Sequence, residues 1–382
     1  MDIAHKSRVT DSGRLAAFSL ADGLFALLLA LGAAYALRAY GGFMDAYETV
    51  ILILTVPAAA TLGWYWKSLR TFMVACAIAA LASQALYQGE LARAEQVFLL
   101  KYFLSSQTAI MWMSATVFLA TAAYWGGLLG DSPFFEHSGT RLAWIAAGAG
   151  FTGLLARWYE SYLISPDVGH IPVSNLYEVF VLFTVLTTLM YLFYEQRYAT
   201  RKLGGFVMLV ISAAVGFLLW YSFARDAHEI QPLIPALQSY WMKIHVPANF
   251  IGYGAFALSA MVGAAYLLAS KGVLAKRLPP LKVLDDVMYR AISIGFVFFT
   301  IATILGALWA AEAWGTYWQW DPKETWALIV WLNYATWLHM RLTKGLRGAV
   351  LAWWALIGLL VTTFAFLGVN MFLSGLHSYG SL

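Results

Sequence analysis

Charged residues are scarce in this sequence. Only 12% of the 382 residues are Asp, Glu, Lys or Arg, whereas 61% are hydrophobic and 16% are aromatic. A soluble globular domain carries about 25% charged residues. Long apolar runs recur along nearly the whole chain, as membrane-spanning helices require. The composition therefore excludes an ordinary soluble protein and predicts a polytopic helical membrane protein.

Cysteine is almost absent as well. The single cysteine, Cys76, lies in an apolar run and is expected to be a small buried hydrophobic residue. One cysteine excludes a disulfide within the chain and a C-x-x-C motif. The sequence also lacks a phosphate-binding loop, zinc-ligand spacing and a nucleophile motif. Candidate chemistry therefore rests on histidine and aromatic side chains.

The apolar runs predict the fold class, an all-α bundle of transmembrane helices. We expect about eleven spans of roughly 20 residues each. They fall near residues 15–40, 46–66, 70–88, 105–129, 142–161, 175–195, 203–223, 246–270, 290–312, 323–341 and 350–373. No long hydrophilic insert separates them. Ala255, Ser259 and Gly263 repeat at four-residue spacing, which favours close helix packing.

The distribution of positive charge predicts the orientation. The N-terminal arm and the loops on its side of the membrane carry 17 of the 24 Lys and Arg residues. Because cytoplasmic loops are enriched in Lys and Arg, the N-terminus is expected in the cytoplasm and the C-terminus on the periplasmic side. His170, His228, His245 and His377 then lie on the outer side, and His5 and His137 lie in cytoplasmic segments.

One loop is unusually aromatic. Residues 314–321 read Trp-Gly-Thr-Tyr-Trp-Gln-Trp-Asp, between two apolar runs. Such a loop could be an interfacial aromatic belt or a platform for a large flat apolar ligand. Asp321 is expected to cap the next helix, with Pro322 at its first position and Glu324 completing a capping box. That helix N-terminus would also favour a carboxylate ligand.

Two outer histidines are candidate metal ligands. His245 begins the span near 246–270, and His377 follows the last span in Gly-Leu-His-Ser-Tyr-Gly. Haem iron is commonly held by histidine nitrogens within apolar and aromatic walls. Each histidine taken alone is most simply an interfacial residue. Together with the aromatic loop on the same side, they predict a bis-histidine haem site.

These motifs resemble those of a known family. The pattern W-G-x-x-W-x-W-D, flanked by His245 and His377, is similar to the WWD domain of CcsA/ResC-type proteins (also named CcsB) of system II cytochrome c biogenesis. Ser-Asn-Leu-Tyr-Glu at 174–178 also looks like that family. The likeness covers about residue 100 to the end. It divides the chain into N-terminal helices without a recognised motif (1–100) and a cytochrome c assembly domain (101–382).

The resemblance implies a function, a ligand and partners. The function is a membrane subunit of a cytochrome c synthetase (haem lyase) complex in the bacterial inner membrane. It would export haem and present it for thioether attachment to apocytochrome c. The implied ligand is haem b, and the implied partners are a ResB/Ccs1-type subunit and an apocytochrome c with a C-x-x-C-H segment. Two alternatives stay open, namely a WWD protein that loads a haem chaperone and a transporter without haem.

The resemblance also implies individual site residues. His245 and His377 would hold the haem iron as catalytic ligands, and the cofactor-binding residues would include Trp314, Trp318, Trp320 and Asp321. His339 lies within the span near 323–341, about 25 Å from its start at about 1.5 Å per residue. A transmembrane histidine there binds haem on its way out in the resembled family, with the second ligand from the partner subunit.

The remaining polar residues of the outer loops are expected to be structural. Ser174 is predicted to cap the helix after His170, and Glu178 in that helix is a possible polar partner of His170. His170 is expected to serve structure or gating. His228 is expected to be a solvated loop residue.

Overall fold

The structure, a computed structural model, describes residues 18–375, and in that range it contains helices and no strand. The predicted all-α fold class is confirmed. The chain forms two compact units, Met1–Ile78 and Ala79–Leu382. The predicted functional division near residue 100 stays a prediction.

The first unit is a helical hairpin followed by the start of a third helix. It contains α1 (Leu20–Tyr40), a short 3-10 turn, η1 (Gly41–Phe43), α2 (Ala46–Tyr65) and the first part of α3 (Lys67–Tyr87). Asp22 in α1 accepts hydrogen bonds from Lys67 Nζ at 2.8 Å and from Arg70 Nη1 at 2.6 Å. Cys76 is buried, as predicted.

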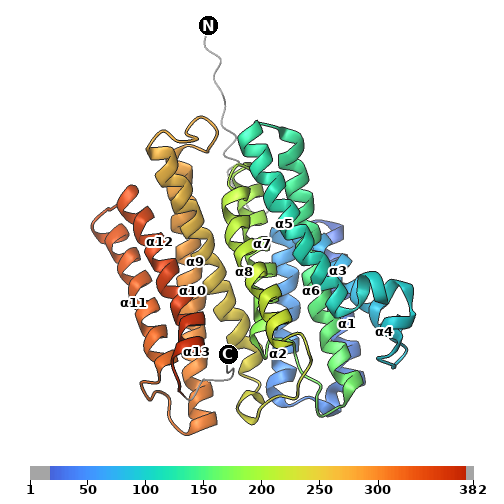
Figure 1. The fold of residues 1–382 in the computed structure, drawn as a ribbon. Helices are drawn as coiled ribbons and strands as arrows, with labels where there is room; N and C mark the ends of the chain where they lie inside the picture. Colours follow the sequence, from blue (N-terminus) through green and yellow to red (C-terminus); the bar gives the residue numbers. More distant parts are fainter. Residues whose placement is uncertain (1–17, 376–382) are drawn as a thin grey trace. The chain divides into compact units, whose positions relative to one another are not determined.

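The second unit contains the rest of the helices (Figure 1). They are α4 (Arg93–Gln96), η2 (Leu100–Leu104), α5 (Ser106–Gly130), α6 (Pro133–Ile164), α7 (Leu176–Arg197), α8 (Gly204–Arg225), η3 (Pro235–Leu237), α9 (Met242–Ser270), α10 (Leu281–Trp314), α11 (Pro322–Thr343), α12 (Ala349–Thr363), η4 (Phe364–Gly368) and α13 (Val369–Phe372). The segments η2 and η4 are single π-helical turns.

Helices overlap all eleven predicted spans. Nine of the described helices are both long and apolar enough to cross a bilayer. The other two long helices are α6, with 32 residues, and α11, with 22. They have sufficient length, but neither contains an 18-residue stretch as apolar as those of the nine.

Each of these two helices carries one buried arginine that is paired with a carboxylate of a neighbouring helix. Arg157 of α6 forms a 2.7 Å ion pair with Glu178 of α7, and both side chains are 1% exposed. Arg341 of α11 donates to both carboxylate oxygens of Asp285 in α10, at 3.0 and 2.7 Å. A removed partner would leave an uncompensated buried charge, which costs about 3–5 kcal/mol. These pairs therefore fix α6 against α7 and α11 against α10.

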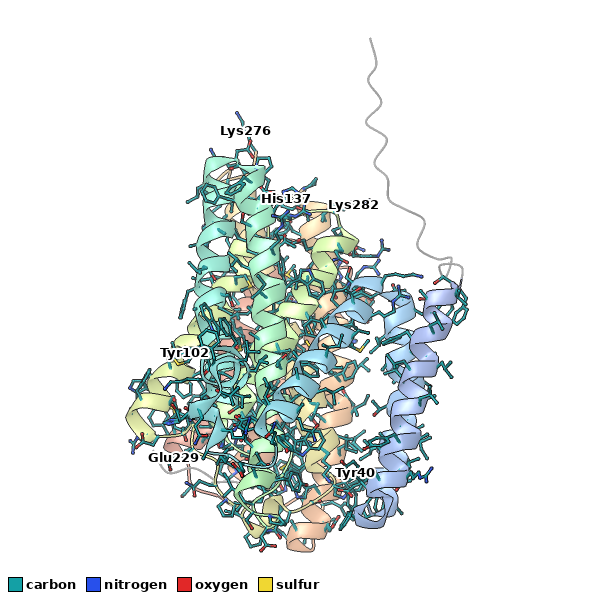
Figure 2. All side chains as sticks on the ribbon, turned by 90° about the vertical axis from the view of Figure 1, so that its right-hand side faces the viewer. Tyr40, Tyr102, His137, Glu229, Lys276 and Lys282 are labelled. Atoms are coloured by element: carbon teal, nitrogen blue, oxygen red, sulfur yellow. The ribbon has the colours of Figure 1, made fainter. Side chains whose placement is uncertain are left out.

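Successive long helices run in opposite directions, so the second unit has two distinct ends. The Trp-loop end holds the aromatic loop 314–321 together with the starts of α7, α9 and α11 (Figure 1). The basic end holds the opposite loops, and Figure 2 shows His137, Lys276 and Lys282 there. Lys202 contacts Asp131 at 2.7 Å and holds the pKa of that carboxyl below its usual value. Within the second unit, the loops predicted to share the cytoplasmic side thus meet at one end.

Close packing in the second unit follows the predicted small-residue stripe of α9. A Cβ on Gly263 would lie 3.0 Å from the carbonyl oxygen of Ala352 in α12. Ser259 Oγ donates to the carbonyl oxygen of Met288 in α10 at 3.2 Å. The stripe therefore lets α9 approach both α10 and α12, as small residues do in membrane bundles.

Candidate haem site

A cavity of about 270 Å³ opens among α7, α9, α10, α11 and the C-terminal helices. Aromatic residues make up about a third of its walls. The aromatic residues that line it are Tyr221, Phe250, Tyr253, Phe299, Trp309, Trp314, Tyr317, Trp318 and Phe366. Of the residues predicted to bind haem, His245, Trp314 and Trp318 lie in this wall. The structure therefore brings one predicted iron ligand and two predicted tryptophans to one cavity.

His245 is held in a defined orientation by α10. Its Nδ1 lies 2.8 Å from the carbonyl oxygen of Ala302. A carbonyl only accepts hydrogen bonds, so this contact assigns the imidazole proton to Nδ1 and the lone pair to Nε2. Iron-ligating histidines commonly donate their other nitrogen to a carbonyl in this way. The donor chemistry of His245 therefore fits a haem ligand.

Two further residues of α10 shape the place of the His245 ring. A Cβ on Gly306 would lie 2.9 Å from His245 Cε1, so only glycine leaves room for the imidazole. Trp309 meets the ring edge to face, with centroids 5.7 Å apart. The indole Nε1 of Trp309 donates to the carbonyl oxygen of Ala236 at 3.1 Å. Trp309 thereby joins the His245 position to the loop before α9.

The aromatic loop presents its tryptophans unequally. Helix α10 ends at Trp314, where Gly315 takes the left-handed conformation with φ of 78°. Trp318 is half-buried in the cavity wall, whereas Trp320 is 67% exposed and lies outside it. The two rings meet edge to face at 5.8 Å. Trp320 therefore supports Trp318 and does not line the cavity itself.

Asp321 caps α11, as predicted. Its side chain accepts from the backbone N–H of Lys323 at 2.9 Å, and Glu324 completes the capping box. Glu324 Oε2 accepts from the backbone N–H groups of Gln319 at 2.7 Å and Asp321 at 3.2 Å. One buried carboxylate therefore fastens the aromatic loop to the first turn of α11. Asp321 is buried beside the cavity and is not part of its wall.

The C-terminal segment returns to the same loop. The π-helical turn η4 precedes α13, and Phe366 and Asn370 from this region line the cavity. Gly375 then lies against the start of α11, where an added Cβ would collide with the Asp321 carboxylate. His377, the second predicted iron ligand, lies outside the described residues. The described chain thus reaches the aromatic loop just before the segment that holds His377.

His339 lies at the basic end, away from this cavity. It occupies the last part of α11 with its side chain exposed on the protein surface. Its Nδ1 lies 3.4 Å from Thr343 Oγ1 one turn later. The structure therefore separates His339 from His245, as the spacing along α11 predicts.

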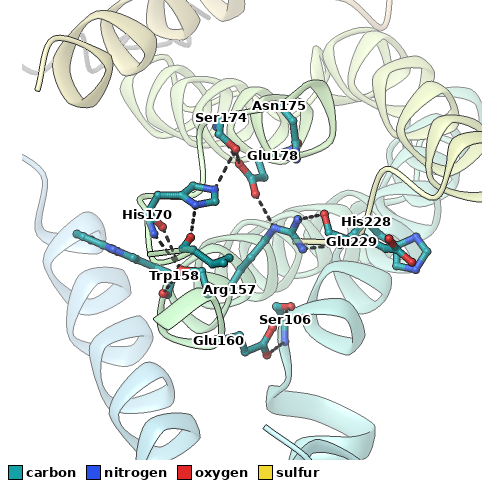
Figure 3. Close-up of polar contacts among 12 residues, drawn as sticks. Ser106, Arg157, Trp158, Glu160, His170, Ser174, Asn175, Glu178, His228 and Glu229 are labelled. Atoms are coloured by element: carbon teal, nitrogen blue, oxygen red, sulfur yellow. Dashed lines mark hydrogen bonds and ion pairs between the residues drawn. The ribbon is translucent and has the colours of Figure 1, made fainter. Parts of the chain in front are cut away.

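His170 belongs to a buried polar network beside the cavity (Figure 3). Its Nε2 lies 3.1 Å from Ser174 Oγ, and Ser174 donates to Glu178 at 2.7 Å. The predicted link from His170 to Glu178 therefore runs through Ser174. The predicted Ser174 cap is wrong by one residue. Asn175 caps α7 by accepting from the N–H of Glu178 at 2.9 Å, because the Ser174 hydroxyl is used by the Glu178 carboxylate.

The same network reaches the loop after α8. The Arg157 guanidinium donates to the carbonyl oxygens of His228 at 2.6 Å and Glu229 at 3.1 Å (Figure 3). The prediction that His228 is a solvated residue is wrong. Its Nδ1 is buried and has no hydrogen-bond partner among residues 18–375. The Arg157 contacts draw this part of the loop against the bundle.

Several residues that shape the site were missed by sequence reasoning. They are the Ala302 carbonyl, Gly306, Trp309 and Lys323. A glycine within an apolar span was visible at 306, but its contact with His245 links positions 61 residues apart. Lys323, next to Pro322 in the helix start, was not among the predicted site residues, although its side chain lines the cavity.

Comparison with known proteins places the chain among cytochrome c biogenesis proteins. Residues 173–377 match the family described as Cytochrome C assembly protein. The chain is 40% identical to the cytochrome c biogenesis protein CcsA of Chlamydomonas reinhardtii over 59% of its length and 64% of that protein. It is 35% identical to CcsA of Chlorella vulgaris over 70% of its length and 93% of that protein.

A solved structure shares the fold. The cytochrome c haem lyase CcmF superposes with a TM-score of 0.52 at 19% identity, covering 69% of this chain and 48% of that one. The CcsA of Parasynechococcus marenigrum strain WH8102 is 36% identical over 59% of this chain and 81% of its own length. Residues 173–377, which match the cytochrome c assembly family, include the aromatic loop and the residues that line the cavity.

Proposed function

Because this chain belongs to the cytochrome c assembly protein family, we propose that it is the membrane subunit of a cytochrome c synthetase. It exports haem and presents it at the Trp-loop end for attachment to apocytochrome c. The observation that carries this proposal is His245, whose Nδ1 contacts the Ala302 carbonyl at 2.8 Å in the wall of an aromatic cavity.

The residues around the cavity have different roles in binding haem b. His245 and His377 would hold the iron. Trp314 and Trp318 pack against the macrocycle and exclude water. Trp320 and Asp321 support the loop that carries them. Two imidazole ligands would also keep other ligands off the iron until the acceptor arrives.

The chain contributes to attachment by positioning. In thioether formation, each thiol of the acceptor C-x-x-C-H segment adds across one vinyl double bond. The sulfur bonds to one vinyl carbon and the proton goes to the other. A ring held by two imidazoles and tryptophan faces keeps both vinyl groups in fixed places, which replaces a diffusive encounter by an oriented one. The histidine of the acceptor would displace one of the two histidine ligands.

The path of haem crosses the membrane from the basic end. The chain lies in the bacterial inner membrane with its N-terminus in the cytoplasm and the Trp-loop end facing the periplasm, as the distribution of Lys and Arg predicts. His339 binds haem on the inner side, with its second ligand from a ResB/Ccs1-type subunit. The exposed position of His339 on α11 supports this, because an exposed imidazole can reach a neighbouring protein.

The proposal is tested by the absorption spectrum of the reduced protein, purified together with its partner subunit. The expected spectrum is that of low-spin, bis-histidine haem. His245→Ala and His377→Ala should each lose most of the bound haem and abolish cytochrome c maturation. Added imidazole should restore part of both, because it fills the vacant ligand position. The exposed His137→Ala is the control. Normal spectra and full maturation in both variants would show that the ligands are misassigned.

A further inference from the structure

Lys323 places one basic side chain in the cavity. It is the second residue of α11 and lines the same wall as His245, Asn249 and Asn370. No other Lys or Arg lines this cavity in the described part of the chain. The Nζ atom lies 5.9 Å from the centre of the Phe366 ring. That distance is at the outer limit of a cation–π contact, about 6 Å, so Phe366 is a weak partner for the charge.

The two carboxylates near Lys323, those of Asp321 and Glu324, accept hydrogen bonds from backbone N–H groups. Glu324, the one acidic residue in the described wall, is engaged by the backbone N–H groups of Gln319 and Asp321. Asp321 accepts from the backbone N–H of Lys323 and attracts its ammonium group. Within residues 18–375, however, no ion pair or hydrogen bond of the Lys323 ammonium group is formed. A half-buried cation without a direct partner is costly, and an anionic ligand group would offset that cost.

The first turn of α11 adds to this preference. Its backbone N–H groups and helix dipole favour negative charge, and the turn borders the aromatic loop. This cavity offers an imidazole, that of His245, and a positively charged group, that of Lys323. Haem suits both, since its iron binds an imidazole and its edge carries two carboxylates.

We propose that Lys323 forms a carboxylate subsite of the cavity and binds a propionate of the haem whose iron His245 ligates. This inference rests on the proposed function. The contact between Lys323 and the propionate fixes the rotation of the haem ring within the cavity, because the propionate edge is drawn towards α11. The vinyl groups, on the opposite edge, then point away from Lys323.

The test compares haem with haem dimethyl ester, in which both carboxylates are masked. Each is titrated by absorbance into the haem-depleted full chain in detergent. The wild type should bind haem about 10-fold more tightly than the ester, as expected when about 1.4 kcal/mol of interaction is lost. Lys323→Gln should weaken haem binding about 10-fold and leave ester binding unchanged. Lys323→Arg should retain the preference, and Lys276→Gln, at the basic end, is the matched control.

Each other outcome has a definite meaning. Equal binding of haem and ester by the wild type would overturn the subsite while leaving the proposed function intact. An equal loss of both ligands in Lys323→Gln would show a purely structural role for Lys323 and would also overturn it. Failure of the wild type to bind either ligand would overturn the proposed function itself.

Discussion

His245 and His339 occupy opposite ends of the same bundle, and their surroundings differ sharply. His245 is enclosed by α10, with its proton directed to a carbonyl, a tryptophan at its edge and a glycine that makes room for it. His339 lies on an exposed surface with one long contact to Thr343. The difference teaches that this chain builds the wall for His245 by itself, whereas an iron site at His339 needs a second protein.

The largest effect is expected from a substitution that tests whether haem passes from the basic end to the Trp-loop end. If haem reaches the outer site through His339, His339→Ala should deplete haem at His245 to a small fraction of the wild-type level, although the two residues do not touch. The measurement is haem content and ligand state of the complex at matched expression. Imidazole in the medium should restore haem, because it can replace the missing ligand. Normal outer haem in the untreated variant would exclude the relay.

A second substitution reduces the space around the His245 ring and leaves the histidine itself in place. In Gly306→Ala the added methyl group would lie 2.9 Å from Cε1 of the His245 imidazole, so the ring must move. Overpacking of this kind costs about 1–3 kcal/mol, and we expect haem retention to fall about 10-fold.

The control for Gly306→Ala is Gly216→Ala in α8, where a Cβ meets nothing within 4 Å. Both substitutions replace a glycine within an apolar helix, so they share any effect on helix propensity. Equal haem content in the two variants would show that the position of the imidazole is not set by α10.

The smallest effects are expected from substitutions of tryptophans in the aromatic loop. Trp318→Ala should lower haem occupancy several-fold, because Trp318 lines the cavity, and Trp318→Phe should be milder because a ring face is kept. Trp320→Ala should have the weaker effect, since Trp320 is 67% exposed and acts through Trp318. The measurement is haem bound per purified chain. A larger loss at Trp320 than at Trp318 would mean that the loop binds haem from its outer face.

The sequence was informative where the signal is local. The helix start at Asp321 and Glu324 was predictable from four adjacent residues, and the helices followed from the apolar runs. Helix α10 begins at Leu281, nine residues before the predicted span, because hydropathy marks the bilayer-spanning part and not the helix. The contacts of His245 with Ala302 and Gly306 were not predictable, since they depend on the register between two apolar helices with no distinguishing pattern.

The buried pairs of α6 and α11 bear on how this protein enters the membrane. A charged residue opposes insertion of a lone span, by about 2.5–3.5 kcal/mol at its centre and by less near its ends. Arg157 meets its counter-charge on the helix made next, and Arg341 meets Asp285 on the helix made just before. Each marginal helix therefore gains its neutralising partner from an adjacent segment of the growing chain. Because the two helices of each pair are consecutive in the sequence, each buried charge and its partner belong to one helical hairpin.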